Sequence, residues 1–134
     1  MGTRQSKMGP NKLKNNTFLQ ACRCHPTDYT PVWYMRQAGR YQPEYRDIKK
    51  TRSLVDIVMD PDLCARVTLL PVEQLKVDAA ILFSDIILPI APMGMAFEIH
   101  DGIGPCLKNP IRVHSDVKRL SIPEFSKSMP YVGE

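Results

Sequence analysis

The sequence predicts an α/β fold whose strands form a parallel sheet. Two short, mainly apolar runs, 31–35 and 78–83, have the length and composition of buried strands. The long stretch between them carries helix signals, and parallel strands need a crossover of this kind. Twelve prolines divide the 134 residues into short elements, and no apolar run is long enough to span a membrane.

The first two helices are predicted from their starting residues. Asn16 or Thr17 can cap a helix that ends near Pro26, before the first strand. After that strand, residues 36–42 contain a glycine and are expected to form a loop. Pro43 then suits the first position of a helix that runs to about residue 50.

The longest helix is predicted to begin at Asp60-Pro61, directly after a short helix over 53–59. A capping carboxylate followed by proline is a strong helix start. Pro71 is expected to bend or restart this helix, which continues to Val77. Its apolar stripe consists of Leu63, Val67 and Leu70.

The remaining elements are shorter. Residues 84–92 are expected as a loop, 96–100 as extended chain, 116–120 as a helix, and Pro130 as the start of another. Two strand–helix units cannot close a sheet on itself, and a (β/α)8 barrel takes about 250 residues. The organisation therefore predicts a part of a larger α/β fold.

Composition narrows the function classes. Hydrophobic residues make up 43% and charged residues 24%, as in a globular protein, and the net charge is +4. The basic cluster 49–52 has no aromatic neighbours, which argues against nucleic-acid binding, and the modest basic excess fits a small polyanion. Cys22-Arg23-Cys24-His25 is spaced too closely for a zinc site, so we expect no metal and reduced cytosolic thiols. Residues 1–15 lack the apolar core of a signal peptide and are expected to be a flexible tail before a domain over 16–134.

The loop after the first predicted strand carries two arginines, Arg36 and Arg40, with Gly39 between them. Sites in parallel α/β proteins lie at the C-terminal ends of strands. Each guanidinium group can hold a carboxylate or phosphate through paired hydrogen bonds, and Gln37 adds a neutral donor. This pattern predicts an anion clamp.

Asp85 directly follows the second predicted strand. A carboxylate here is costly unless it holds a cation or an N–H group. Alternatives stay open for both loops: Asp85 can simply cap the next segment, and the arginines can pair with Glu44 or Asp47 to fix their loop.

Residues 31–46, PVWYMRQAGRYQPEYR, resemble the N-terminal signature of uroporphyrinogen decarboxylases almost residue for residue. The resemblance continues through 71–74 (PVEQ), 78–86 (DAAILFSDI) and 102–105 (GIGP), and it covers roughly residue 16 to the end. Sixteen consecutive positions make it far more specific than a short glycine motif.

The resemblance implies a distorted (β/α)8 barrel of which this chain is the N-terminal part. It implies a homodimeric carboxy-lyase that needs no metal or organic cofactor and contacts neither nucleic acid nor membrane. Its reaction converts uroporphyrinogen III to coproporphyrinogen III and four CO2 in haem synthesis. The expected location is the cytoplasm, or a plastid if the source is a photosynthetic eukaryote.

The resemblance also assigns residues. Arg36 and Arg40 would hold substrate carboxylates, and Asp85 would lie under the macrocycle and accept hydrogen bonds from pyrrole N–H groups. Arg46, Arg52 and Arg112 are read as surface or helix charges. The implied substrate-binding set is Arg36, Gln37, Ala38, Gly39, Arg40 and Asp85, with Asp85 as the catalytic member.

Catalytic side chains that the family takes from later loops, a tyrosine, a serine or threonine and a histidine, have no match here. The chain alone is therefore expected to be incomplete for catalysis. One alternative is a truncated product that binds porphyrinogen or a partner without turnover. Another is a corrinoid-dependent methyltransferase on the same barrel, although such relatives lack this arginine–glycine–arginine loop.

Overall fold

A computed structural model describes residues 15–100 and 102–133 of the chain. The predicted tail over 1–15 therefore lies outside the described residues, apart from Asn15. The α-helices are α1 (Thr17–Cys22), α2 (Pro43–Lys49), α3 (Leu54–Met59), α4 (Pro61–Leu75) and α5 (Phe125–Ser128). The 3-10 helices are η1 (Leu88–Ile90), η2 (His114–Arg119) and η3 (Pro130–Val132), and the strands are β1 (Phe97–His100) and β2 (Gly104–Leu107).

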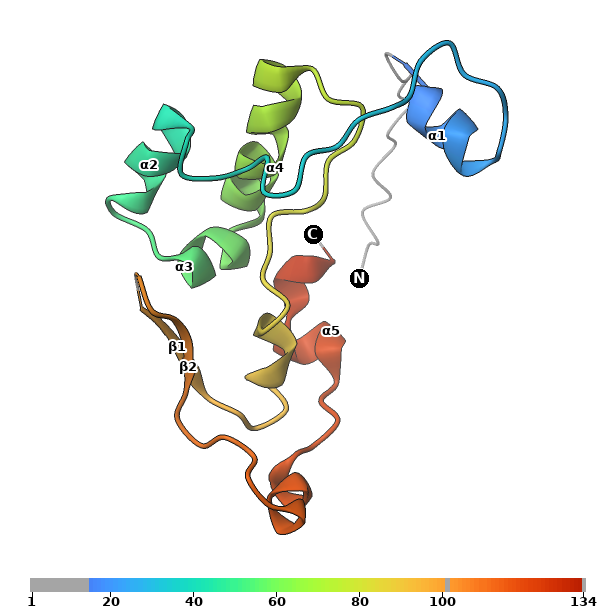
Figure 1. Ribbon diagram of the computed structural model, residues 1–134. Coiled ribbons are helices and arrows are strands. Elements are labelled where there is room, and N and C mark those ends of the chain that lie inside the picture. Colours follow the sequence, from blue (N-terminus) through green and yellow to red (C-terminus); the bar gives the residue numbers. More distant parts are fainter. Residues whose placement is uncertain (1–14, 101, 134) are drawn as a thin grey trace, which may run out of the picture.

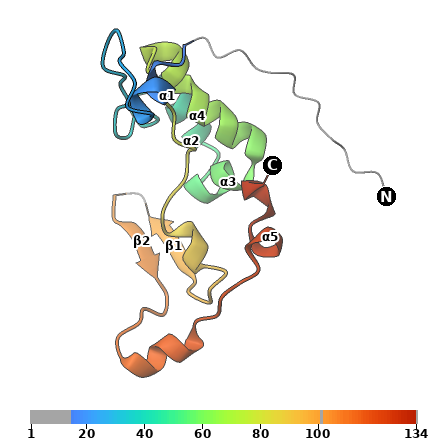
Figure 2. The ribbon, with the colours of Figure 1, turned by 90° about the vertical axis from the view of Figure 1, so that its right-hand side faces the viewer.

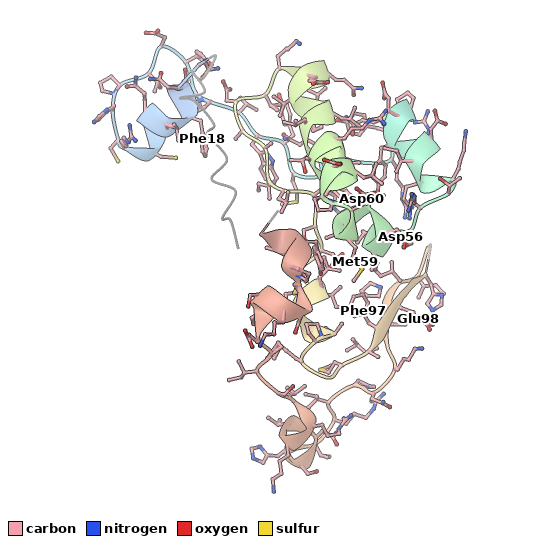
Figure 3. All side chains as sticks on the ribbon, turned by 180° about the vertical axis from the view of Figure 1, so that it is seen from behind. Phe18, Asp56, Met59, Asp60, Phe97 and Glu98 are labelled. Atoms are coloured by element: carbon pink, nitrogen blue, oxygen red, sulfur yellow. The ribbon has the colours of Figure 1, made fainter. Side chains whose placement is uncertain are left out.

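The helices α2, α3 and α4 lie together, with the hairpin, η1 and α5 below them (Figure 1). Residues 76–88 connect these two groups, as Figure 2 shows from the side. Helix α1, which carries Phe18, stands apart from α2–α4 (Figure 3). No helix in the described part of the chain has the length and apolar character needed to cross a bilayer.

The predicted helices of residues 43–75 are confirmed, and their caps explain them. Pro43 occupies the first turn of α2. Ser53 and Asp56 form a reciprocal capping box on α3, with N···O distances of 2.8 Å to the Asp56 carboxylate and 3.1 Å to the Ser53 hydroxyl. The Asp60 carboxylate caps α4 by accepting a hydrogen bond from the Leu63 N–H group at 3.1 Å.

Helix α4 differs from its prediction at its end. It remains one helix through the buried Pro71, and it ends at Leu75 rather than at Val77. Lys76 adopts a left-handed conformation with φ of 55°, which terminates the helix. Its N–H group still bonds to the Val72 carbonyl oxygen at 3.1 Å.

The predicted strands over 31–35 and 78–83 are not formed, so the parallel sheet predicted between them is wrong for the described residues. Both segments lie side by side, and the Asp78 N–H group donates to the Val32 carbonyl oxygen at 3.0 Å. A ladder needs repeated backbone hydrogen bonds along both strands, whereas one backbone bond joins these two segments in the described part of the chain. The expectation of burial on both faces is also wrong, because Ile81 is 63% exposed.

The sheet that does form is an antiparallel hairpin, in which Phe97 pairs with Leu107 and His100 with Gly104. Extended chain over 96–100 was predicted and is confirmed, but β2 was missed. Its sequence signal is the turn-forming stretch DGIG at 101–104. Near the C-terminus, the predicted helix over 116–120 is 3-10 helix η2, Pro130 begins η3 as expected, and α5 was not predicted.

Two apolar clusters hold these elements together. The first consists of Tyr45, Ile57 and Val67 from α2, α3 and α4. The second consists of Val58, Leu88 and Met129. Phe83 packs against both, and its ring lies 5.5 Å from that of Tyr45 between centroids. Phe83 therefore fixes the end of the second predicted strand against the helices.

Candidate functional site

The arginine loop is a compact, irregular turn, as the sequence predicts. The Gln37 N–H group donates to the Tyr34 carbonyl oxygen at 3.0 Å, and Arg36 between them has a left-handed φ of 60°. A Cβ on Gly39 would lie 3.1 Å from the Arg36 carbonyl oxygen, so this position favours glycine. Arg36 and Arg40 are both exposed, which leaves their guanidinium groups accessible from outside the core.

Gln37 fixes the loop to the second extended segment. Its side chain is only 5% exposed. The carbonyl end accepts a hydrogen bond from the Tyr34 N–H group at 3.1 Å, and the amide end donates to the Ala79 carbonyl oxygen at 3.0 Å. The Tyr41 hydroxyl group donates to the Gln37 carbonyl oxygen. The neutral donor expected from the sequence is thus engaged within the protein.

Arg46 supports the loop from α2. Its Nη1 atom donates to the carbonyl oxygens of Arg40 at 3.1 Å and Tyr41 at 2.9 Å. The sequence reading of Arg46 as a helix charge missed this contact. Spacing alone gives no signal for it, because the contact depends on how the loop folds back on the helix.

The acids named as alternative partners of the arginines have other contacts. Asp47 pairs with Lys50 at 2.7 Å. The pKa of Glu44 is lowered, first by its own backbone N–H group and then by the side chain of Gln74. Both acids therefore stabilise α2 and its contact with α4.

Asp85 lies two residues after Phe83, whose backbone is held by α4. The Phe83 N–H group donates to the Thr68 hydroxyl oxygen at 2.8 Å, and the Cys64 thiol donates to the Phe83 carbonyl oxygen at 3.1 Å. Burial raises the pKa of Cys64, which keeps it a neutral donor. These bonds fix the start of the Asp85 loop.

The half-buried Asp85 carboxylate uses one oxygen locally. Its Oδ1 atom accepts a hydrogen bond from the Ile87 N–H group at 3.0 Å, so the capping alternative describes this oxygen correctly. The Oδ2 atom has no hydrogen-bond partner among the described residues. One oxygen can therefore cap the turn while the other accepts from a ligand.

The two loops are attached to the same core. Ala38 of the arginine loop and Phe83 at the start of the Asp85 loop both pack against the cluster of Tyr45, Ile57 and Val67. The Gln37–Ala79 hydrogen bond joins the segments that precede them. Two exposed cations and a half-buried carboxylate on adjoining loops can bind an anionic ligand that also carries N–H groups.

Two grooves lie elsewhere, and the predicted site residues line neither. The first has a volume of about 570 Å³ and lies between α2–α3 and β1. Figure 3 shows Phe97 and Glu98 on β1 below α3, which carries Asp56 and Met59. The second, about 530 Å³, is apolar and is lined by residues of η3 and α5 with Pro89.

This arrangement places a loop with two exposed arginines and a loop with a half-buried carboxylate on one core, in a chain of helices and one hairpin. Residues 13–134 match the sequence model of the family Uroporphyrinogen decarboxylase (URO-D). The chain belongs to this family, which confirms the resemblance found in its sequence.

Curated relatives carry the same description. The chain is 55% identical over 124 residues to the uroporphyrinogen decarboxylase of Geobacillus sp. (strain WCH70), covering 92% of this chain and 36% of the relative. It is 56% identical over 120 residues to that of Geobacillus kaustophilus (strain HTA426), with 90% and 35% covered. It is 51% identical over 125 residues to that of Bacillus pumilus (strain SAFR-032), with 93% and 36% covered. The chain thus spans about a third of the length of these relatives.

Proposed function

We propose that this chain is the N-terminal part of a uroporphyrinogen decarboxylase barrel. In that protein it would contribute the arginine loop and Asp85 to conversion of uroporphyrinogen III to coproporphyrinogen III. The observation that supports this most is 55% identity over 92% of the chain to a protein of that name. The partner of the complete protein would be a second copy, and its location the cytoplasm.

The substrate itself provides the electron sink for this reaction. When a pyrrole carbon is protonated, the ring becomes iminium-like, and the bond to the acetate carboxyl can break with its electron pair moving into the ring. CO2 leaves, the acetate carbon takes a proton to become a methyl group, and the ring loses the added proton. Each round therefore exchanges one carboxyl group for a proton, and the enzyme needs no organic cofactor or metal for it.

The residues of this chain would orient the substrate and stabilise its charge. Arg36 and Arg40 are exposed at one turn and can bind two of the eight substrate carboxylates through planar, paired hydrogen bonds. The free Oδ2 atom of Asp85 can accept hydrogen bonds from pyrrole N–H groups and stabilise the cationic ring as it forms. The backbone around Ala38 and Gly39 would line the cleft.

A hybrid enzyme tests this proposal. Residues 13–134 replace the aligned segment of the Geobacillus kaustophilus decarboxylase, and coproporphyrinogen formation is followed by chromatography after oxidation to porphyrins. We expect turnover close to that of the parent. An inactive but folded hybrid would instead favour a segment that binds porphyrinogen without turnover. Zinc bound stoichiometrically to the native, longer protein that contains this segment would favour the methyltransferase alternative.

Substitutions in the hybrid then separate the roles. We expect Asp85→Asn to lower kcat by about a hundredfold or more while the melting temperature is kept. Arg36→Lys and Arg40→Lys should rescue the corresponding alanine variants poorly, because an ammonium group cannot form the planar fork. Near-normal turnover of Asp85→Asn would remove Asp85 from the mechanism, and lysine variants as active as arginine would contradict the paired-bond argument.

A further inference from the structure

We infer that Gln42 is a positioning residue that holds the arginine turn in its working conformation through Gln74 of α4. This inference rests on the proposed function and adds a residue outside the predicted substrate-binding set.

Gln42 is a buried residue that hydrogen-bonds to the backbone of the turn. It is completely buried, with 0% of its surface exposed. Its Oε1 atom accepts a hydrogen bond from the Gly39 N–H group at 3.1 Å, and its own N–H group donates to the Gly39 carbonyl oxygen at 3.0 Å. Both backbone groups of Gly39, the residue beside Arg40, are therefore fixed by Gln42.

The other end of the Gln42 amide is fixed to a different element. Its Nε2 atom donates to the Oε1 atom of Gln74 at 2.9 Å, across 32 positions of sequence. Gln74 lies in the last turn of α4, and its side chain also bonds to the carboxylate of Glu44 in the first turn of α2. The amide thus connects the turn to two helices.

The choice of a glutamine at this position needs a reason. An apolar side chain of the same size would fill the space without the cost of burying an amide. The amide is retained with its carbonyl oxygen and its NH2 group both bonded, so its hydrogen bonds determine where the turn lies. Loss of the amide would leave the Gly39 N–H group without this acceptor.

The position of the turn determines the position of both arginines. Arg36 and Arg40 flank Gly39, and the Arg36 carbonyl oxygen is already within 3.1 Å of where a Gly39 Cβ would be. Arg46 also holds the turn, because its side chain donates hydrogen bonds to the carbonyl oxygens of Arg40 and Tyr41. A shift of about 1 Å in such a turn is enough to misplace the charged groups and weaken binding.

The test uses the hybrid decarboxylase with Gln42→Met, which keeps the volume and removes both side-chain hydrogen bonds. We expect KM for uroporphyrinogen to rise about tenfold while kcat changes less than about threefold, because binding of carboxylates is affected more than the chemical step. Gln74→Met should have the same effect in a smaller degree. Gln74→Glu combined with Glu44→Gln retains an acceptor for the Gln42 amide without placing two carboxylates together, and it should keep KM near that of the unsubstituted hybrid.

Two controls separate positioning from stability. Val58→Ala weakens the second apolar cluster, against which no residue of the turn packs, and Gln20→Met makes the same chemical change in α1. All variants are compared well below their melting temperatures. Should Gln42→Met fail to fold, Gln74→Met and the double variant Gln74→Glu/Glu44→Gln test the same contact from the end of α4.

The outcomes are distinguishable. If Gln42→Met leaves KM unchanged, or Val58→Ala raises KM equally, the positioning inference is overturned and Gln42 is a core residue. If Gln74→Glu/Glu44→Gln behaves like Gln74→Met, the hydrogen bond to α4 is not what matters and the inference is again overturned. An unsubstituted hybrid that folds without turnover contradicts the proposed function itself.

Discussion

Two regions of the molecule differ in the interactions that determine their structure. One is the helical region of residues 43–75, and the other consists of the two extended segments that flank it, 31–35 and 78–83. In the helical region, each helix begins at a cap or proline within a few residues of its own sequence, and Ile57 is fully buried among its neighbours. The extended segments are just as apolar in sequence, yet Ile81 is 63% exposed. A helix satisfies its own backbone, whereas a strand needs partners from elsewhere.

The comparison shows which contacts fix the two loops of the candidate site. The arginine loop follows one extended segment and the Asp85 loop follows the other, but both loops are fixed by contacts to the helices. Ala38 and Phe83 pack on the helical core, and Thr68 of α4 holds the Phe83 N–H group. The helical region therefore organises the site even though the strands are not formed.

The largest expected effect contrasts two isoleucines. Ile57→Ala should lower the free energy of unfolding of the helical region by about 2–5 kcal/mol, because it removes buried methyl groups and leaves a cavity. Ile81→Ala in the exposed segment should change it by no more than about 0.5 kcal/mol. Urea denaturation followed by circular dichroism at 222 nm measures both. Equal losses would mean that Ile81 is packed in solution and that the contrast between the regions is wrong.

A smaller effect tests whether local caps define the helices. Asp60→Ala should destabilise the chain by about 1 kcal/mol, because the Leu63 N–H group loses its acceptor at the start of α4. Asp60→Asn keeps an oxygen in the same place and should stay close to the parent. The same denaturation experiment compares them. A loss for Asn as large as that for Ala would assign the effect to charge rather than to the cap.

What the sequence could predict follows the same division. Pro43, Ser53 and Asp60 predict helix starts because each acts within three residues of its own position. The helices begin where these residues predict. The parallel ladder predicted between 31–35 and 78–83 is not formed, because pairing depends on neighbours that neither segment's own sequence reveals. The antiparallel hairpin was missed although its turn signal is local.

The candidate site divides in the same way. Arg36, Arg40 and Asp85 could be named because charged residues after apolar runs are visible in the sequence. The Gln42–Gln74 contact could not, because it joins positions 32 apart and exists only once the turn packs on α4. Residue chemistry thus names candidates for contact with a ligand, which stay predictions, whereas the groups that hold them needed the structure.

The smallest expected effect concerns Asp78, which ties the two extended segments together. The Tyr29 hydroxyl group at 2.6 Å, the Asn15 side-chain amide at 3.0 Å and the Val32 N–H group at 2.9 Å all donate to its carboxylate. These donors, the tyrosine first, lower the pKa of Asp78. Because the folded-state pKa is lowered, the hydrogen bonds to Asp78 contribute their full stabilisation above the ordinary carboxyl pKa of about 4. This stabilisation is lost as pH falls through the lowered value.

Fluorescence of Trp33, the single tryptophan, reports on this tie because its neighbour Val32 is one of the donors. We expect a change in its emission below about pH 4 that precedes loss of the helical signal, since the helices contain their own caps. Asp78→Asn should give the low-pH emission already at pH 7, and Tyr29→Phe should move the transition to higher pH by removing the strongest donor. Unchanged emission and pH profile in Asp78→Asn would mean that the segments are held together without the carboxylate. The backbone bond from Asp78 to Val32 would then be the contact that aligns them, and the pairing would be closer to that of a true strand than the exposure of Ile81 indicates.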